Sequence, residues 1–430
     1  MKRTSKKIQL QNTTEFTSKL FDWSQQFEQI AWLDSNNYEQ KYSSYDIVLA
    51  VDAFTLLTTN TTEAFTKLQH YKNDCKDYIF GYLSYDLKNE IEALTSANSD
   101  GLNFSDLYFF QPKKLFFLNG NELIIEYLEY FEHEIESDIK DILSYIKPEI
   151  EIEHDVKIHK RITKQQYLDQ LDKILNHIHR GDIYEVNFCQ EFYAENVSVD
   201  LFQVYKKLNE ISKPPFASFL KIDNNYLLSA SPERFVRKHK QTIISQPIKG
   251  TAKRLADKKL DKALALALEQ DEKERTENIM IVDLVRNDLS KTAIKGSVKV
   301  EELCKVYSFD QVHQLISTIV SEVSDQIDAV DIIKSLFPMG SMTGAPKLSA
   351  MKIIEDLETT KRGAYSGAIG YFTPSNDFDF NVVIRSILYN DLRKYLSYSV
   401  GGAITSKSDP EKEYQECLLK AIAMKIALKN

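Results

Sequence analysis

Two segments of the chain carry glutamates three residues apart. Glu274 and Glu277 lie in DEKERTENIMIVDLVRNDL, and Glu413 and Glu416 lie in DPEKEYQECLLKA. Residues three apart share one face of a helix, so each pair directs two carboxylates the same way. Oxygen ligands without His or Cys suit a hard cation such as Mg²⁺ better than zinc. Taken singly, each pair is more often a solvated helix face than a metal site.

A glycine-rich segment, Gly340 to Lys347 (GSMTGAPK), offers backbone N–H groups to an anion, with Pro346 at the expected first turn of a helix. It is not a Walker A sequence, because Lys347 does not follow Gly344 directly and no Ser or Thr comes after it. A kinase or nucleotide hydrolase is therefore excluded.

Three further polar groups stand beside expected strands or turns. Gly401 and Gly402 follow a strand and allow close approach to the backbone, and Arg385 interrupts an apolar strand where it can bind a carboxylate. Each feature alone is more simply explained by a tight turn or a structural ion pair.

Lys249 in QPIKGT and Glu233 in SPERF are candidates for covalent and acid–base chemistry. Next to cations or in a dry cleft, the pKa of a lysine falls and its amine becomes a nucleophile. Glu233, just after an expected strand, would then be the general acid or base. His313 in VHQLIS, by itself, is more simply a hydrogen-bonded core histidine.

The elements that must position these residues divide the chain in two. Strand-like runs cover residues 45–51, 78–85, 114–118 and 123–127, and Asn119-Gly120 predicts a hairpin between the last two. A charged stretch from Glu132 to Lys160 predicts one surface helix, a break at Pro148 and a connector. We therefore place the main boundary there, between an N-terminal region over 1–150 and a second domain over 160–426.

The second region alternates helices and strands. Thr163 as N-cap and Gly181 as stop predict an amphipathic helix over 162–179. Further helices are expected over 261–287 and 345–358, and strands over 183–188, 217–220, 226–229, 368–372, 382–388 and 395–400. This pattern predicts a large α+β domain.

Composition limits the possible classes of function. The 430 residues are 43% apolar and 27% charged, which excludes a disordered or fibrous protein. The net charge of −9 argues against nucleic acid or an acidic membrane as partner. Four scattered cysteines without a CxxC pair predict reduced thiols. Without a signal sequence or an apolar run of about 18 residues, a cytoplasmic location is expected.

Eight motifs in this order resemble the chorismate-utilising enzymes. They are QPIKGT, SPERF, DEKERTENIMIVDLVRNDL, VHQLIS, GSMTGAPK, KRGAYSGAIGYF, VIRS and DPEKEYQE. That family contains the large subunits of anthranilate synthase and aminodeoxychorismate synthase, with isochorismate and salicylate synthases as relatives. The resemblance covers about 160–425 and extends weakly to GYLSYDL at 81–87. It implies an α/β sandwich of antiparallel sheets with helices outside and a β-rich N-terminal region packed on it.

Within the family, Lys249 distinguishes the branches. Anthranilate synthases have alanine at the matching position, whereas aminodeoxychorismate synthases have lysine. The resemblance thus implies attack of Lys249 on C2 of chorismate as the C4 hydroxyl leaves, followed by ammonia arriving at C4. The product would be 4-amino-4-deoxychorismate, used for 4-aminobenzoate and folate synthesis.

The resemblance also implies roles for the other residues. Glu277 and Glu416 match direct Mg²⁺ ligands, Glu274 and Glu413 match acids that hold metal-bound water, and Glu233 matches the acid that protonates the leaving hydroxyl. His313 lies in a motif lining the site. The residues expected to bind substrate are Arg385, Tyr365, Gly401, Gly402, Lys420, Gly344, Thr343 and Thr251.

Two positions raise separate questions. Glu185 stands where the family usually has Gln and where isochorismate and salicylate synthases have a Lys base. It can be a base, help to deprotonate incoming ammonium, or only hold a hydrogen bond. Leu33 to Asn36 resembles the segment that contacts tryptophan in anthranilate synthases, but this match is too short to predict feedback inhibition.

The expected partners are small molecules and one protein. We expect chorismate as substrate and ammonia from a separate glutamine amidotransferase subunit in a heterodimer. We also expect a separate lyase downstream, because the chain ends at Asn430, soon after the last family motif. The alternatives are anthranilate synthase component I, disfavoured by Lys249, and isochorismate synthase, disfavoured by Glu185. A non-catalytic chorismate- or tryptophan-binding subunit is a third, disfavoured by the complete set of carboxylates.

Overall fold

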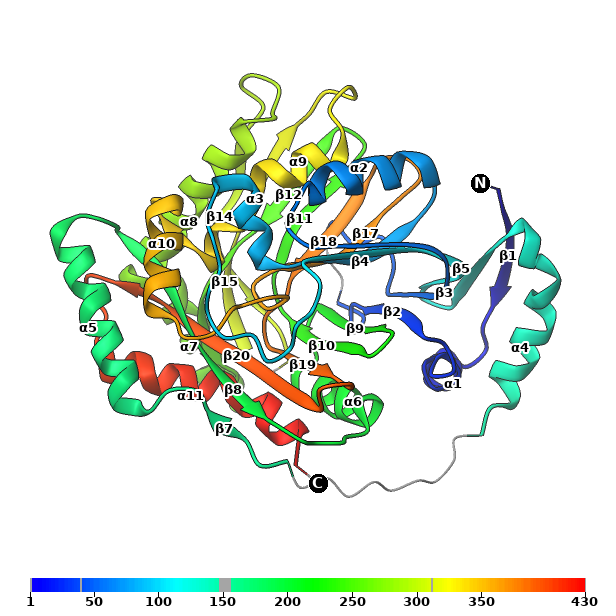
Figure 1. Ribbon diagram of the computed structural model, residues 1–430, viewed down its shortest axis with the longest axis horizontal. Helices are drawn as coiled ribbons and strands as arrows, with labels where there is room; N and C mark the ends of the chain where they lie inside the picture. Colours follow the sequence, from blue (N-terminus) through cyan, green and yellow to red (C-terminus); the bar gives the residue numbers. More distant parts are fainter. Residues whose placement is uncertain (1, 39–40, 147–155, 311, 430) are drawn as a thin grey trace.

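The computed structural model describes residues 2–38, 41–146, 156–310 and 312–429, and it is a mixed α/β architecture with helices on the outside (Figure 1). The expected break at Pro148 lies outside the described residues. The helices are α1 (Thr13–Ser24), α2 (Ala64–Cys75), α3 (Lys88–Glu92), α4 (Ile135–Ser144), α5 (Lys164–Arg180), α6 (Leu201–Ser212), α7 (Lys258–Gln270), α8 (Glu272–Ser290), α9 (Ala329–Leu336), α10 (Lys347–Leu357) and α11 (Pro410–Ala427).

The strands join into one hydrogen-bonded network. In chain order they are β1 (Arg3–Gln9), β2 (Gln29–Asp34), β3 (Ile47–Thr59), β4 (Ile79–Leu83), β5 (Leu107–Asn119), β6 (Glu122–Leu128), β7 (His159–Lys160), β8 (Glu185–Ala194), β9 (Phe216–Ile222), β10 (Asn225–Ser231), β11 (Arg234–His239), β12 (Thr242–Gln246), β13 (Ile248–Lys253), β14 (Lys299–Ser308), β15 (Val312–Glu322), β16 (Gly344–Ala345), β17 (Ala368–Phe372), β18 (Phe378–Val382), β19 (Ser386–Asn390) and β20 (Tyr395–Thr405). Strand β8 pairs with β16 and β20, and β13 pairs with β15. All three pairs are antiparallel, as the expected sandwich of antiparallel sheets requires.

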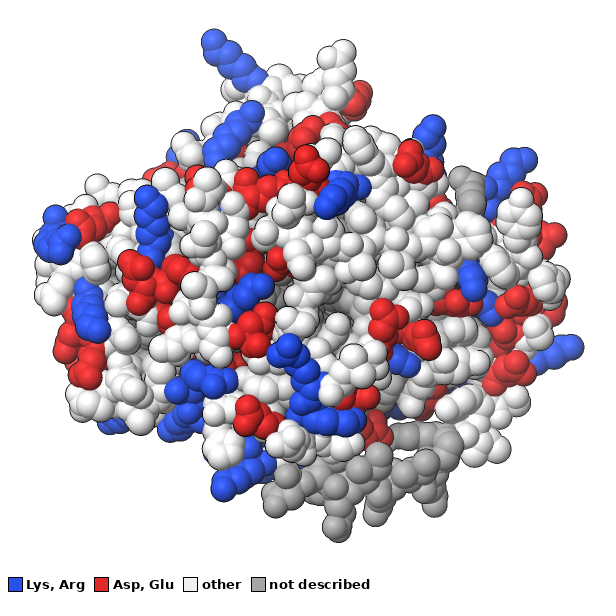
Figure 2. All heavy atoms as spheres, in the orientation of Figure 1, with Lys and Arg blue, Asp and Glu red and all other residues white. Residues whose placement is uncertain are grey.

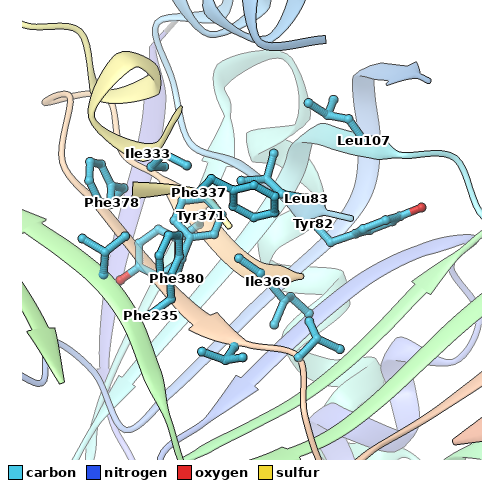
Figure 3. Packing of buried hydrophobic residues seen from close by; sticks show 14 of the residues in the cluster. Tyr82, Leu83, Leu107, Phe235, Ile333, Phe337, Ile369, Tyr371, Phe378 and Phe380 are labelled. Carbon is cyan, nitrogen blue, oxygen red and sulfur yellow. The ribbon is translucent and has the colours of Figure 1, made fainter. Parts of the chain in front are cut away.

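The two sequence regions pair with each other. Strand β2 pairs with β9, and β4 pairs with β17. One apolar core correspondingly contains Tyr82, Leu83 and Leu107 from the first region beside residues of the second, as Figure 3 shows for Phe337, Tyr371 and Phe380. Burial of these large side chains, each worth about 1.5–3 kcal/mol, ties the two regions together.

A second core lies between the network and the helices α5, α6 and α11. Tyr167 of α5 packs against Phe188 of β8 and against Tyr414 of α11, and all three side chains are buried. These helices lie alongside the β8–β20 pair in Figure 1. The C-terminal helix that carries Glu413 and Glu416 is thereby fixed against the central strands.

Several local signals act as the sequence predicts. Thr163 and Gln166 form a capping box at the start of α5, and Gly181 ends it with φ 84°. The Asn119-Gly120 segment turns β5 into β6, with Asn119 opposite Glu122. All four cysteines are free thiols, and Cys189, Cys304 and Cys417 are buried.

Two elements that were predicted to be continuous are interrupted in the structure. The helix expected over 261–287 is two helices, because Asp271 ends α7 and caps α8 through its side chain, which accepts from the Glu274 N–H. The strand expected over 382–388 stops at Val382 and resumes at Ser386. Arg385 between them has φ 53°, so it stands at a bend and not inside a strand.

Charge is distributed evenly on the face shown in Figure 2, where acidic and basic side chains are intermixed. Within the described ranges, no helix combines the length and the hydropathy that a membrane span requires.

Candidate active site

Lys249 on β13 lies at the centre of a group of carboxylates. Its ammonium donates a hydrogen bond to Oε1 of Glu185 at 2.8 Å, and both side chains are nearly inaccessible to solvent. Burial alone lowers the pKa of Lys249, but the carboxylates of Glu185, Glu277 and Glu233 outweigh it and raise that pKa. The pKa of this lysine is therefore raised and not lowered, because the cleft that buries it supplies anions.

Glu233, between β10 and β11, is a buried carboxyl near this lysine. Burial raises its pKa to about 7, although the Ser341 hydroxyl, Lys249 and the Ile248 N–H each favour the ionised form. Ser341 donates to Oε1 of Glu233 at 2.6 Å. A carboxyl with a pKa near neutral pH can donate a proton in one step and accept one in the next.

The GSMTGAPK segment holds the floor of the site by close backbone contacts. Gly344 has φ 150°, and a Cβ placed there would lie 2.1 Å from the carbonyl oxygen of Glu185. Gly344 and Ala345 form β16, which pairs with Val186 and Glu185 of β8. Only glycine allows this approach, so the loop fixes the backbone of Glu185.

The four glutamates of the two ExxE pairs surround one cation of the chain itself. Lys273 on α8 lies 3.8 Å from Oε1 of Glu277 and 3.5 Å from Oε1 of Glu413, and it also interacts electrostatically with Glu274 and Glu416. Burial raises the pKa of Glu277 to about 7, and its Oε1 is buried without a hydrogen-bond partner. Among the described residues, no three acidic, His or Cys side chains are arranged as a closed metal site.

The oxygen-only donor set and the unpartnered Oε1 of Glu277 nevertheless fit a hard divalent cation. A cation there would contact the buried oxygen of Glu277 that has no hydrogen-bond partner. Lys273 would have to move away from Glu277 of α8 and Glu413 of α11 to make room for that cation.

Residues expected to bind substrate gather beside Glu416. Lys420 pairs with Glu416 at 2.8 Å and donates to the carbonyl oxygen of Gly401 at 2.9 Å. A Cβ on Gly402 would lie 3.4 Å from Oε2 of Glu413. Gly401 must be glycine for a different reason, because its Cβ would lie 2.4 Å from the Cys189 sulfur.

Arg385 completes this group from the bend between β18 and β19. Its guanidinium donates to the Lys420 carbonyl oxygen at 3.5 Å. Burial lowers its pKa, while Tyr365 and Glu416 act in the opposite direction. The Tyr365 hydroxyl is buried 3.6 Å from the Cys189 sulfur. A half-buried guanidinium at this position is suited to an anionic ligand.

Three predicted site residues lie outside these contacts in the described part of the chain. His313 is buried with both ring nitrogens engaged, Nε2 with Asp261 at 3.0 Å and Nδ1 with the Ser308 hydroxyl at 2.8 Å. Thr251 is exposed on β13, and the Thr343 hydroxyl donates to main-chain carbonyls of its own loop. Their roles toward a substrate stay predictions.

Two residues of the site were not anticipated. Ser341 lies within GSMTGAPK, where its hydroxyl was overlooked beside the backbone donors, and Lys273 lies within DEKERTEN, between the acids that drew attention. Two signals in the sequence could have identified them. Ser341 is a hydroxyl within a loop expected to bind an anion, and Lys273 is next to Glu274, an acid expected to hold metal-bound water.

The segment Leu33 to Asn36 lies apart from this site. Leu33, Asp34 and Ser35 line a separate cavity together with Arg234 and Asp379. Burial raises the pKa of Asp34 to about 6.

The comparisons with known proteins agree with this architecture. A family model described as chorismate binding enzyme matches residues 17–425. Aminodeoxychorismate synthase component 1 of Escherichia coli is 41% identical over 255 residues, which cover 59% of this chain and 56% of that protein. The protein of the same name from Bacillus subtilis is 33% identical over 376 residues, covering 84% of this chain and 79% of its own.

A solved structure, anthranilate synthase component I from Streptococcus pneumoniae, superimposes with a TM-score of 0.77 at 23% identity. The superposition covers 90% of this chain and 93% of that one. This likeness concerns the fold. With the Escherichia coli relative, the aligned part spans little more than half of that protein's length.

Proposed function

Since the chain belongs to the chorismate-binding enzyme family, we propose that it converts chorismate and ammonia to 4-amino-4-deoxychorismate. The observation that carries this proposal is the position of Lys249. It is hydrogen-bonded to Glu185 within a cluster of carboxylates, and it interacts electrostatically with Glu233. A buried amine held beside a carboxyl of raised pKa is the pairing that covalent displacement of a hydroxyl requires.

In the proposed reaction, the Lys249 nitrogen attacks C2 of the ring, the ring double bonds shift, and the C4–O bond breaks. Glu233 gives its proton to the departing oxygen, which leaves as water. Ammonia then attacks C4, the bond between C2 and Lys249 breaks, and Glu233 takes a proton from the new amino group. The enzyme returns to its starting state.

The other residues hold the substrate. Arg385, Tyr365 and the Gly401 backbone would bind the enolpyruvyl carboxylate, and Lys420 would bind the ring carboxylate. Glu277 and Glu416, with Glu274 and Glu413, would hold Mg²⁺, which supplies positive charge to the ring carboxylate when bound. Ammonia would come from a separate glutamine amidotransferase subunit, as the "component 1" in the relatives' names suggests.

The test is the mass of the product after the purified chain is incubated with chorismate, Mg²⁺ and an ammonium salt. The expected product keeps its pyruvyl group and carries an amino group in place of the C4 hydroxyl. Anthranilate would assign the chain to the sister activity, and isochorismate would make water the nucleophile. Either product would refute the proposal.

The variant Lys249→Ala tests the covalent step. Intact-mass analysis should show an adduct of chorismate less one water on the unaltered chain and none on the variant. Direct addition of ammonia can still give the variant some turnover. An unaltered chain that never carries an adduct would refute the nucleophilic role.

A further inference from the structure

The partner of Lys249 is itself unusual in its surroundings. The side chain of Glu185 is 1% exposed, and its Oε1 accepts from Lys249 while Oε2 has no hydrogen-bond partner. Its main chain pairs with Ala345 of β16 on one side and with Thr405 of β20 on the other. The main chain of Glu185 is thus fixed by strand pairing on both sides, and one oxygen of its carboxylate is buried without a hydrogen-bond partner.

The ion pair poses a chemical requirement. An ammonium has no lone pair, so Lys249 must lose a proton before its nitrogen can attack. The charged groups that interact with Lys249 are Glu185 from β8, Glu233 from the β10–β11 connection, Glu274 and Glu277 from α8, and Glu416 from α11. Of the residues that the structure describes, Glu185 alone is hydrogen-bonded to the ammonium.

The other carboxylates are committed elsewhere in the proposed reaction. Among the described residues, no hydrogen bond joins Glu233 to Lys249, and Oε1 of Glu233 accepts from Ser341 instead. Glu274, Glu277 and Glu416 belong to the proposed magnesium site. Glu185 is the remaining carboxylate within reach, and the 2.8 Å contact is the distance that proton transfer requires.

We propose that Glu185 is the proton acceptor for Lys249, an inference that rests on the proposed function. Oε1 of Glu185 takes the proton from the ammonium as the nitrogen lone pair forms the bond to C2. After ammonia has displaced the lysine, the neutral amine takes the same proton back from the Glu185 carboxyl. The proton shuttles within the pair, and no further acid or base is consumed.

A role limited to structure makes a different prediction. Gln at position 185 can still accept a hydrogen bond from Lys249, but it cannot take its proton. The replacement Glu185→Gln therefore preserves shape and the hydrogen bond while removing the proposed chemistry.

The experiment measures formation of the Lys249 adduct in the absence of ammonia, by rapid quench and intact mass, with chorismate and Mg²⁺. For Glu185→Gln we expect a rate at least about a hundredfold lower at pH 7.5, rising with pH as hydroxide replaces the lost acceptor. The melting temperature should change little. An adduct rate within about threefold of the unaltered chain, with the same pH profile, would overturn the proposal.

Glu191→Gln is the matched control. Glu191 is equally buried on the same strand, but its partners are Arg161, Tyr395 and Ser397. This variant should lose stability and keep the pH profile of adduct formation. If it changed that profile as Glu185→Gln does, the effect would be structural and the proposal would fail.

A second pair of variants covers the case in which Glu185→Gln does not fold. Glu185→Asp and Glu185→Asn shorten the side chain equally, and only Asp can accept a proton. The Asp variant should form adduct at least about tenfold faster than the Asn variant, and equal rates would overturn the proposal. If the unaltered chain makes aminodeoxychorismate but never an adduct, this inference fails while the proposed overall reaction stands.

Discussion

Replacing Glu277 with Gln should stabilise the metal-free protein at alkaline pH. Burial raises the pKa of Glu277 to about 7 from an ordinary value of 4.5, with Lys249 and Lys273 only partly offsetting it. In the folded chain the carboxylate is therefore ionised at a cost above pH 7, whereas in the unfolded chain it ionises freely. The amide resembles the protonated form and avoids this cost.

The magnitude follows from the two pKa values. The contribution of the protonated Glu277 carboxyl to the free energy of unfolding is fully present below about pH 4.5. It is lost as the pH rises through about 7. At pH 8 the loss amounts to about 3 kcal/mol, and at pH 5 to less than about 1 kcal/mol. Glu277→Gln should therefore raise the free energy of unfolding by about 3 kcal/mol at pH 8 and change it little at pH 5.

The assay is urea unfolding at the two pH values in a chelator, repeated with Mg²⁺. Mg²⁺ should stabilise the unaltered protein at pH 8 and stabilise the variant far less, because the variant lacks a ligand. Glu269→Gln, on the exposed surface of α7, is the control and should change neither value. Equal pH dependence in the variant and the unaltered protein would refute the argument from burial, and an undiminished Mg²⁺ effect would remove Glu277 from the metal group.

Three further outcomes are expected. Ser341→Ala removes a hydrogen bond that favours ionised Glu233, so the pKa of Glu233 should rise above about 7. The alkaline limb of the pH profile of kcat/KM should then move to higher pH. An unmoved limb would mean that Glu233 is not the acid. Gly344→Ala places a Cβ against the Glu185 carbonyl oxygen and should cost about 2 kcal/mol or more in urea unfolding, whereas Gly120→Ala, in open space, should cost about 1. Thr163→Ala breaks the capping box of α5 and should lower the free energy of unfolding by about 1 kcal/mol, while an unchanged value would mean that the cap is dispensable.

Elements defined by neighbouring residues could be predicted from the sequence. The cap and stop of α5, the β5–β6 hairpin and the helical ExxE pairs depend on residues a few positions apart, so their signals are local. Whether a predicted helix or strand is continuous was harder to predict. The division between α7 and α8 depends on a cap at Asp271 within a helical pattern, and the bend at Arg385 depends on a backbone angle that periodicity does not report.

By itself the sequence determined the residue types of the site: a lysine among acids, two pairs of carboxylates and a glycine-rich loop. Tertiary structure decided how those groups behave. The pKa of Lys249 rises because Glu185, 64 positions earlier, is folded against it, and Glu233 meets a hydroxyl 108 positions away. Electrostatic effects depend on distance and burial in space, and those exist only once strands distant in the chain have paired.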